Sequence, residues 1–225
     1  MQAEPLILSF DTSAAHCAAA LLRGDTLLAA RTEEMSRGQA ERLMPIMQEM
    51  MSDQGVSWAD LDAIGVGIGP GNFTGIRISV SAARGLALAR NIPAIGVSNF
   101  EILREGQSAG REIVSVAAPR DQVYLQLFDQ GAPAAKPVHF DPEAPDTALT
   151  VLGAQRVIGA QAERIASLLG IAQALPCEMA QVPERIARIA ARKLATQTDH
   201  ARPAPLYIRA ADAAPPSDAP PVILD

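Results

Sequence analysis

A strand that runs through a glycine-rich turn directly into a helix constrains the fold of this chain more than any other feature. The apolar run from Ala63 to Ile68 predicts a buried strand, and residues 76–90 predict a helix crowded with small side chains. Between them lies Gly-Pro-Gly-Asn-Phe-Thr-Gly, residues 69–75. Strands that alternate with helices in this way indicate an α/β fold.

The glycine-rich turn has two interpretations. Its glycines allow backbone N–H groups to approach an anion or a partner backbone, or they form a tight turn in which Asn72 or Thr74 caps the helix. The known phosphate-loop patterns do not match, because no Lys follows the turn and Asn72 stands where the last Gly of a dinucleotide motif would be. The capping turn is the preferred interpretation.

Asp11, Thr12 and Ser13 follow the first predicted strand, residues 6–10. Ligands bind at the carboxyl ends of strands, and an Asp there can hold a divalent ion with a phosphate. The alternative is an Asx-type turn that leads into a hairpin. The sequence does not choose between them.

The remaining pattern divides the chain into two similar halves. The first half adds strands at 16–22, 26–32 and 94–97, a helix at 39–51, and capping boxes at Ser57 and Ser98. The second half adds strands at 113–118, 123–128, 137–140 and 157–159, and helices at 162–169 and 183–195. We therefore expect an N-terminal lobe at 1–105, a C-terminal lobe at 106–212, and a flexible proline-rich tail at 213–225.

Composition excludes several classes of function. The 225 residues carry a net charge of −6 and only 4% aromatic residues, which disfavours stand-alone nucleic-acid binding unless a local basic patch exists. Three scattered histidines and two distant cysteines form no metal-ligand spacing, and no nucleophile lies in an activating motif. No apolar stretch approaches the roughly 20 residues of a membrane span. We expect a cytoplasmic protein with no metal site and no catalytic residue.

Two helices attract attention beyond the core. The methionine-rich helix at 39–51 has apolar residues on more than one face, and methionine is frequent at adaptable binding surfaces. Together with the small-residue helix it forms either the core or a partner interface. A row of cations at Arg185, Arg188, Arg192 and Lys193 is interpreted as a solvated helix face, with contact to RNA phosphates as the minor alternative.

Several motifs together resemble the bacterial TsaB (YeaZ) family. They are Ile-Leu-Ser-Phe-Asp-Thr-Ser at 7–13, Glu-Arg-Leu-Met-Pro at 41–45, Gly-Ile-Gly-Pro-Gly-Asn-Phe-Thr-Gly-Ile-Arg at 67–77, Gly-Leu-Ala at 85–87, Gly-Val-Ser at 96–98, Val-Tyr at 123–124 and Pro-Leu-Tyr-Ile-Arg at 205–209. The run at 67–77 is the most specific of them.

The resemblance implies an actin-like, sugar-kinase-like ATPase fold of two similar lobes. It also implies a role in making threonylcarbamoyladenosine at tRNA position 37, as the non-catalytic partner of the transferase TsaD, with the small ATPase TsaE joining the complex and tRNA contacted only indirectly. We expect no cofactor in the isolated chain, whereas ATP or ADP binding with partners, and a homodimer in isolation, stay open. The expected nucleotide-binding residues are Asp11, Thr12, Ser13, Gly69, Gly71, Asn72 and Thr74; the expected partner interface is Leu43, Met44, Met47, Met51, Ser79, Val80 and Ala83.

The chain departs from the family pattern at two places, and other functions compete. Gln39 replaces a common His, which makes metal binding still less expected, and Ala-Ala-Pro-Arg at 117–120 replaces a more charged stretch. The main alternative is an autonomous ATP-dependent phosphotransferase that uses Asp11 and the glycine-rich turn, although the C-terminal half shows no second phosphate loop. A peptidase would need a nucleophile that the sequence does not offer.

Overall fold

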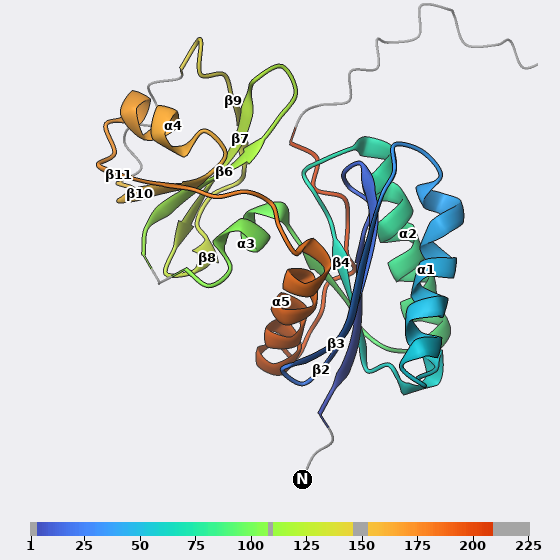
Figure 1. Cartoon of the computed structure of the whole chain (residues 1–225). Helices are drawn as coiled ribbons and strands as arrows, with labels where there is room; N and C mark the ends of the chain where they lie inside the picture. Colours follow the sequence, from blue (N-terminus) through green and yellow to red (C-terminus); the bar gives the residue numbers. More distant parts are fainter. Residues whose placement is uncertain (1–3, 108–109, 146–152, 209–225) are drawn as a thin grey trace, which may run out of the picture.

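Two mixed β-sheets form the framework of the computed structural model, which describes residues 4–107, 110–145 and 153–208 (Figure 1). The first sheet has the order β3-β2-β1-β4-β5. The strands β1, β2 and β3 are antiparallel, whereas β4 and β5 run parallel to β1. Leu8 at its centre pairs with Leu21 on one side and Ile64 on the other. Its strands are β1 (Leu6–Asp11), β2 (His16–Arg23), β3 (Thr26–Glu34), β4 (Ala63–Gly67) and β5 (Ala94–Val97).

The second sheet repeats this plan. Its order β11-β10-β6-β7-β8 places β6 between the antiparallel β7 and the parallel β10, and β9 also pairs with β7. The similarity of the two halves is therefore confirmed at the level of topology. The strands are β6 (Glu112–Ala117), β7 (Val123–Asp129), β8 (Ala132–Pro133), β9 (Val138–Phe140), β10 (Arg156–Gly159) and β11 (Gln173–Pro176).

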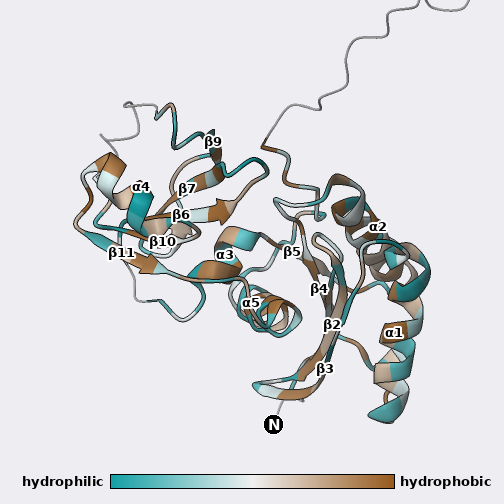
Figure 2. Cartoon of the chain, turned by 45° about the horizontal axis from the view of Figure 1, so that its top comes forward, coloured by the Kyte–Doolittle hydropathy of each residue, from teal (hydrophilic) through white to brown (hydrophobic). Residues whose placement is uncertain are grey.

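Helices cover both faces of the first sheet (Figure 1). Helices α1 (Gln39–Asp53) and α2 (Phe73–Arg90) pack on one face, and α5 (Val182–Thr196) packs on the other. Figure 2 shows hydrophobic residues along the strands and hydrophilic ones at the ends of α1. No helix among the described residues combines the length and hydrophobicity that crossing a membrane requires.

The last helix of each half packs on the sheet of the other half. The short helix α3 (Asn99–Arg104) follows β5 but contacts β6 and β10, whereas α5 follows β11 but contacts β1 and β4. Arg104 and Arg156 both pair with the fully buried carboxylate of Glu112 on β6, which ties α3 to the second sheet. Although α5 belongs to the range 106–212 of the predicted C-terminal lobe, it packs against the sheet of the N-terminal lobe.

Most predicted elements are present, and the differences are local. Helix α2 begins at Phe73 rather than Ile76, because Asn72 caps it three residues earlier than the apolar pattern begins. The short helix α4 (Ala162–Leu169) and the single turn η1 (Trp58–Asp60) occur as expected. Strands β8 and β11 were missed, since two and four residues are too few for an alternation signal. The predicted tail and Arg209 lie outside the described residues.

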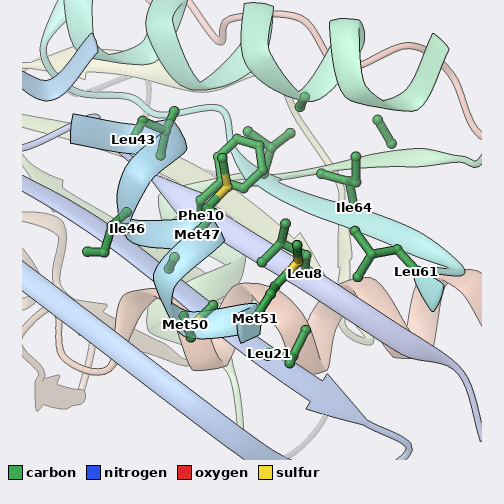
Figure 3. Packing of buried hydrophobic residues seen from close by; sticks show 14 of the residues in the cluster. Leu8, Phe10, Leu21, Leu43, Ile46, Met47, Met50, Met51, Leu61 and Ile64 are labelled. Atoms are coloured by element: carbon green, nitrogen blue, oxygen red, sulfur yellow. The ribbon is translucent and has the colours of Figure 1, made fainter. Parts of the chain in front are cut away.

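Six of the seven side chains predicted for the partner interface are buried, so they are not available at the surface of α1 and α2, and a partner interface on these helices stays a prediction. Met44 alone is exposed, at 43%. The other side chains are at most 2% exposed and belong to the core under the first sheet, where Leu43, Met47 and Met51 approach Leu8 and Phe10 (Figure 3). The apolar residues of α1 that looked like a second face are needed to fill the space between α1, α2 and the sheet. The six buried residues are Leu43, Met47, Met51, Ser79, Val80 and Ala83.

Candidate functional site: the cleft between the lobes

A cleft of about 560 Å³ lies between the two lobes, where the strands β1, β4 and β10 end. Ser13, Pro70 and Gly71 line it from the first lobe. Residues 159–161 and 176–179 line it from the second lobe. A cavity of this size is typical of small-molecule sites.

Asp11 lies at the end of β1 but does not face this cleft. Its Oδ1 accepts hydrogen bonds from the Ser13 amide and hydroxyl, both at 2.9 Å, and lies 2.7 Å from Nε2 of His16. The side chain is fully buried. Its Oδ2 has no hydrogen-bond partner among the described residues and lies against Gly67, where a Cβ, if one were added, would come within 1.9 Å of it. The Asx-type turn is therefore confirmed, and the carboxylate is enclosed by its own chain.

The glycine-rich turn packs against the segment that follows β1. The side chain of Asn72 accepts a hydrogen bond from the Gly75 amide at 2.9 Å, which confirms the predicted cap. The backbone amide of Asn72 donates to the Ser13 carbonyl at 2.7 Å, and the Thr12 hydroxyl donates to the Gly75 carbonyl at 2.6 Å. A Cβ on Gly71 or Gly75 would lie 2.5 or 1.8 Å from a carbonyl oxygen of this segment. Close backbone packing thus accounts for these glycines without a bound anion.

The second lobe contributes an equivalent turn that sequence reasoning missed. Gly159 ends β10 with a φ of 109°, and a Cβ there would meet the Ser115 carbonyl oxygen at 2.2 Å. The Ala160 amide donates to the same carbonyl at 3.0 Å. Gln161 then begins α4 in a left-handed conformation and donates to Asp121. A glycine between a strand and a helix was the available signal.

The residues of the cleft do not fit a magnesium nucleotide. Among the described residues, its lining includes one charged side chain, Glu178, and neither Lys nor Arg. Asp11 is the side chain best suited to bind a divalent ion, but it is fully buried and does not line the cleft. The backbone amide of Asn72 already donates to the Ser13 carbonyl. Among the described residues, no group of three or more His, Cys, Asp or Glu side chains is arranged to hold a metal ion. A triphosphate would face a carboxylate with no compensating cation.

The structure brings the predicted nucleotide residues together but exposes few of them to the cleft. Ser13 and Gly71 line it. Thr12 and Gly69 are buried and do not line it. Asn72 and Thr74 are exposed at the start of α2, outside the cleft lining. Their nucleotide-binding role stays a prediction.

A second cluster, also missed from the sequence, lies at the outer side of the α2 N-terminus. The guanidinium of Arg77 lies 3.6 Å from the centre of the Phe73 ring and donates through Nε to the Tyr207 hydroxyl at 2.7 Å. The two rings are 45% and 47% exposed. This contact joins two residues that are 130 positions apart in the sequence, so no local pattern predicts it.

The chain is similar to proteins of known sequence over most of its length. The family model described as tRNA N6-adenosine threonylcarbamoyltransferase (TsaD) matches residues 31–211. The tRNA threonylcarbamoyladenosine biosynthesis protein TsaB of Escherichia coli is 35% identical over 128 residues, which cover 55% of each chain. An uncharacterized protein of Mycobacterium tuberculosis is 32% identical over 211 residues, covering 93% of this chain and 94% of that protein. The match thus spans about half the length of E. coli TsaB.

Two solved structures from Pseudomonas aeruginosa superpose well on this chain. YeaZ has a TM-score of 0.61 at 28% identity, covering 85% of this chain and 92% of that one. A protein described as similar to peptidase YEAZ has a TM-score of 0.67 at 26% identity, covering 91% and 100%. With the duplicated sheet topology, these similarities define an α/β protein of the actin-like, sugar-kinase-like ATPase fold. Within that class, the chain belongs to the TsaB (YeaZ) family.

Proposed function

We propose that this chain takes part in tRNA threonylcarbamoyladenosine biosynthesis as the non-catalytic partner subunit of a TsaD-like transferase. Family membership and the names of its relatives support the pathway. The enclosure of Asp11 carries the non-catalytic part of the proposal. A carboxylate with zero exposure, held by Ser13 and His16, has no access to a substrate in the cleft.

The outer face of α1 is the proposed docking surface for the transferase. Met44 is exposed on it, and Pro45 and Gln48 are exposed beside Met44. Most of the remaining apolar residues of α1 are buried against the sheet, which holds the helix rigidly in place. A rigid helix with an exposed Met is suited to packing against a partner helix. A TsaE-like ATPase would join the pair, and the transferase would supply the chemistry and the main contact with tRNA.

The docking proposal is tested by mixing the purified chain with the TsaD-like transferase of the same organism. Sedimentation velocity should show a heterodimer that Met44→Glu weakens at least about tenfold, because a carboxylate would be buried without a partner. Leu168→Glu on α4 is the matched control, since Leu168 is 39% exposed on the other lobe and its substitution should leave the affinity within twofold. The chain alone, run in parallel, reports any homodimer. Absence of a heterodimer for the wild type would contradict the proposal.

Activity measurements separate this proposal from the autonomous phosphotransferase. Modified adenosine in tRNA, measured by mass spectrometry, should require the chain together with the transferase, TsaE and threonylcarbamoyl-adenylate. The chain alone should neither turn over ATP nor shift its melting temperature with magnesium ATP, because no Lys or Arg of the described residues lines the cleft. Enzyme-like ATP turnover by the chain alone would overturn the non-catalytic assignment.

A further inference from the structure

A basic groove lies beside the C-terminal half of α2, away from the cleft between the lobes. It has a volume of about 380 Å³ and lies between α2, the start of β5 and the segment 200–203. Arg84, His200 and Arg202 line it, and Ala87, Leu88 and Ile92 contribute apolar surface. Neither Asp nor Glu lines this groove in the part of the chain that the structure describes. In a protein with a net charge of −6, this is a local positive site.

The charges of this groove are not neutralised within the described structure. Arg84 donates through Nε to the Pro203 carbonyl at 2.7 Å, a neutral partner that positions the guanidinium and leaves its charge uncompensated. Arg202 is exposed and makes neither a hydrogen bond nor an ion pair with any described residue. His200 offers a ring nitrogen to the same space.

Three of the four cations that the sequence singled out on α5 behave in the opposite way, whereas Arg185 donates to the Ile102 carbonyl at 3.1 Å. Arg188 pairs with Glu184 at 2.9 Å, Arg192 with Glu105 at 3.0 Å, and Lys193 with Glu101 at 2.7 Å. Those cations are therefore balanced by carboxylates from α5, from α3 and from the residue that follows α3. Apart from the half-buried Arg185, the uncompensated cations of these two regions therefore lie on α2 and the segment 200–203.

The exposed face of α2 connects the groove to the aromatic cluster at the other end of the helix. At 100° per residue, Phe73, Arg77, Arg84 and Leu88 fall within a sector of about 60° and extend over about 22 Å. Helix α2 contains three arginines and no acidic residue. Exposed rings that stack on bases, followed by cations that contact phosphates, are the features of a single-stranded nucleic-acid surface.

We propose that this face binds an RNA strand, with Arg84 and Arg202 contacting its phosphates and Phe73 and Tyr207 stacking on unpaired bases. The inference rests on the proposed function, because the transferase partner would bring tRNA to the complex. An acidic peptide could use the cations but would need apolar or aromatic side chains at the right spacing to use the two exposed rings, whereas every unpaired base offers a face that stacks on them. The observations therefore favour RNA over an acidic protein partner.

The test measures binding of a fluorescein-labelled RNA hairpin with an unpaired loop to the full chain by anisotropy, across a series of KCl concentrations. Arg84→Gln with Arg202→Gln should weaken binding at low salt at least about tenfold, and should reduce the slope of log affinity against log salt by about 1.4, or 0.7 for each phosphate contact. Glutamine at 84 keeps a donor for the Pro203 carbonyl. The matched control, Arg188→Gln with Arg192→Gln, removes the same charge from α5 and should stay within twofold of wild type.

A single variant and a competing polyanion complete the test. Should the double variant melt early, Arg202→Gln alone should still lower the slope by about 0.7, because Arg202 holds no other part of the described structure. Absence of RNA binding by the wild type, equal loss in the control, or displacement of the RNA by polyglutamate at equal charge would overturn the RNA assignment. A heterodimer that forms normally while the RNA slope is unchanged refutes this inference alone. RNA binding that depends on Arg84 and Arg202 without any heterodimer refutes the proposed function alone.

Discussion

Replacing Gly75 with Ala tests whether the glycine-rich turn exists for backbone packing. A Cβ at Gly75 would lie 1.8 Å from the Thr12 carbonyl oxygen, so α2 and the segment after β1 must separate. Separation strains the core and also breaks the bond from the buried Thr12 hydroxyl to the Gly75 carbonyl. Overpacking costs about 1–3 kcal/mol and an unsatisfied buried hydroxyl about as much again, against a helix-propensity gain of about 1 kcal/mol. The expected net loss is about 3 kcal/mol.

Gly85→Ala is the matched control for this experiment. Gly85 lies in the same helix and is exposed, and a Cβ there meets nothing within 4 Å. The substitution should stabilise the protein by about 1 kcal/mol through helix propensity. Urea unfolding followed by fluorescence of Trp58, the single tryptophan, reports the lobe that contains both glycines. A Gly75→Ala protein within about 1 kcal/mol of wild type would refute the packing explanation.

Three further predictions follow from buried or hydrogen-bonded groups. Glu112→Gln should destabilise the chain by about 3 kcal/mol in urea unfolding, because two arginines would lose their buried counterion; wild-type stability would contradict this. Hydrogen bonds from Ser57 lower the pKa of Asp60, so the Asp60 carboxylate stabilises the folded protein at neutral pH and this contribution is lost as the pH falls below about 4. The difference in unfolding midpoint between wild type and Asp60→Asn should therefore shrink below about pH 4. A difference that stays constant with pH would contradict this prediction. Burial raises the pKa of the Cys17 thiol to about 11, so iodoacetamide at pH 8 should modify only Cys177 in the folded protein. Two adducts on the folded protein in mass spectrometry would refute this prediction.

The local structure of this chain is well encoded in short stretches of sequence. The Asn72 cap depends on a neighbour three residues away, so a local pattern was sufficient to predict it. The Asx turn at Asp11 is equally local, but the sequence did not distinguish it from a ligand site. The boundaries of α1 and the hairpin of β2 and β3 follow from short-range patterns for the same reason. The run of strands at the start of each half indicated two similar halves, whereas the order of the strands in each sheet was known only from the structure.

The site required information that no short stretch contains. The apolar width of α1 is equally consistent with a core and with a docking face, and only its position between β2 and α2 shows that Met47 and Met51 are buried. The cleft depends on Gly159 and residues 176–179, which are brought to Ser13 by the arrangement of the two sheets. The sequence could not show that Arg192 and Lys193 of α5 pair with Glu105, which follows α3, and with Glu101 of α3.

The sequence by itself determined the elements, their caps and their order, because hydrogen bonds between near neighbours and the alternation of apolar residues decide these features. Tertiary structure alone decided which polar groups remain available to a partner. Asp11 is enclosed by Gly67, Ser13 and His16, whereas Arg84 and Arg202 pair with no carboxylate of the described residues. Burial and charge neutralisation depend on contacts between residues distant in the sequence, and these contacts exist only once the chain has folded.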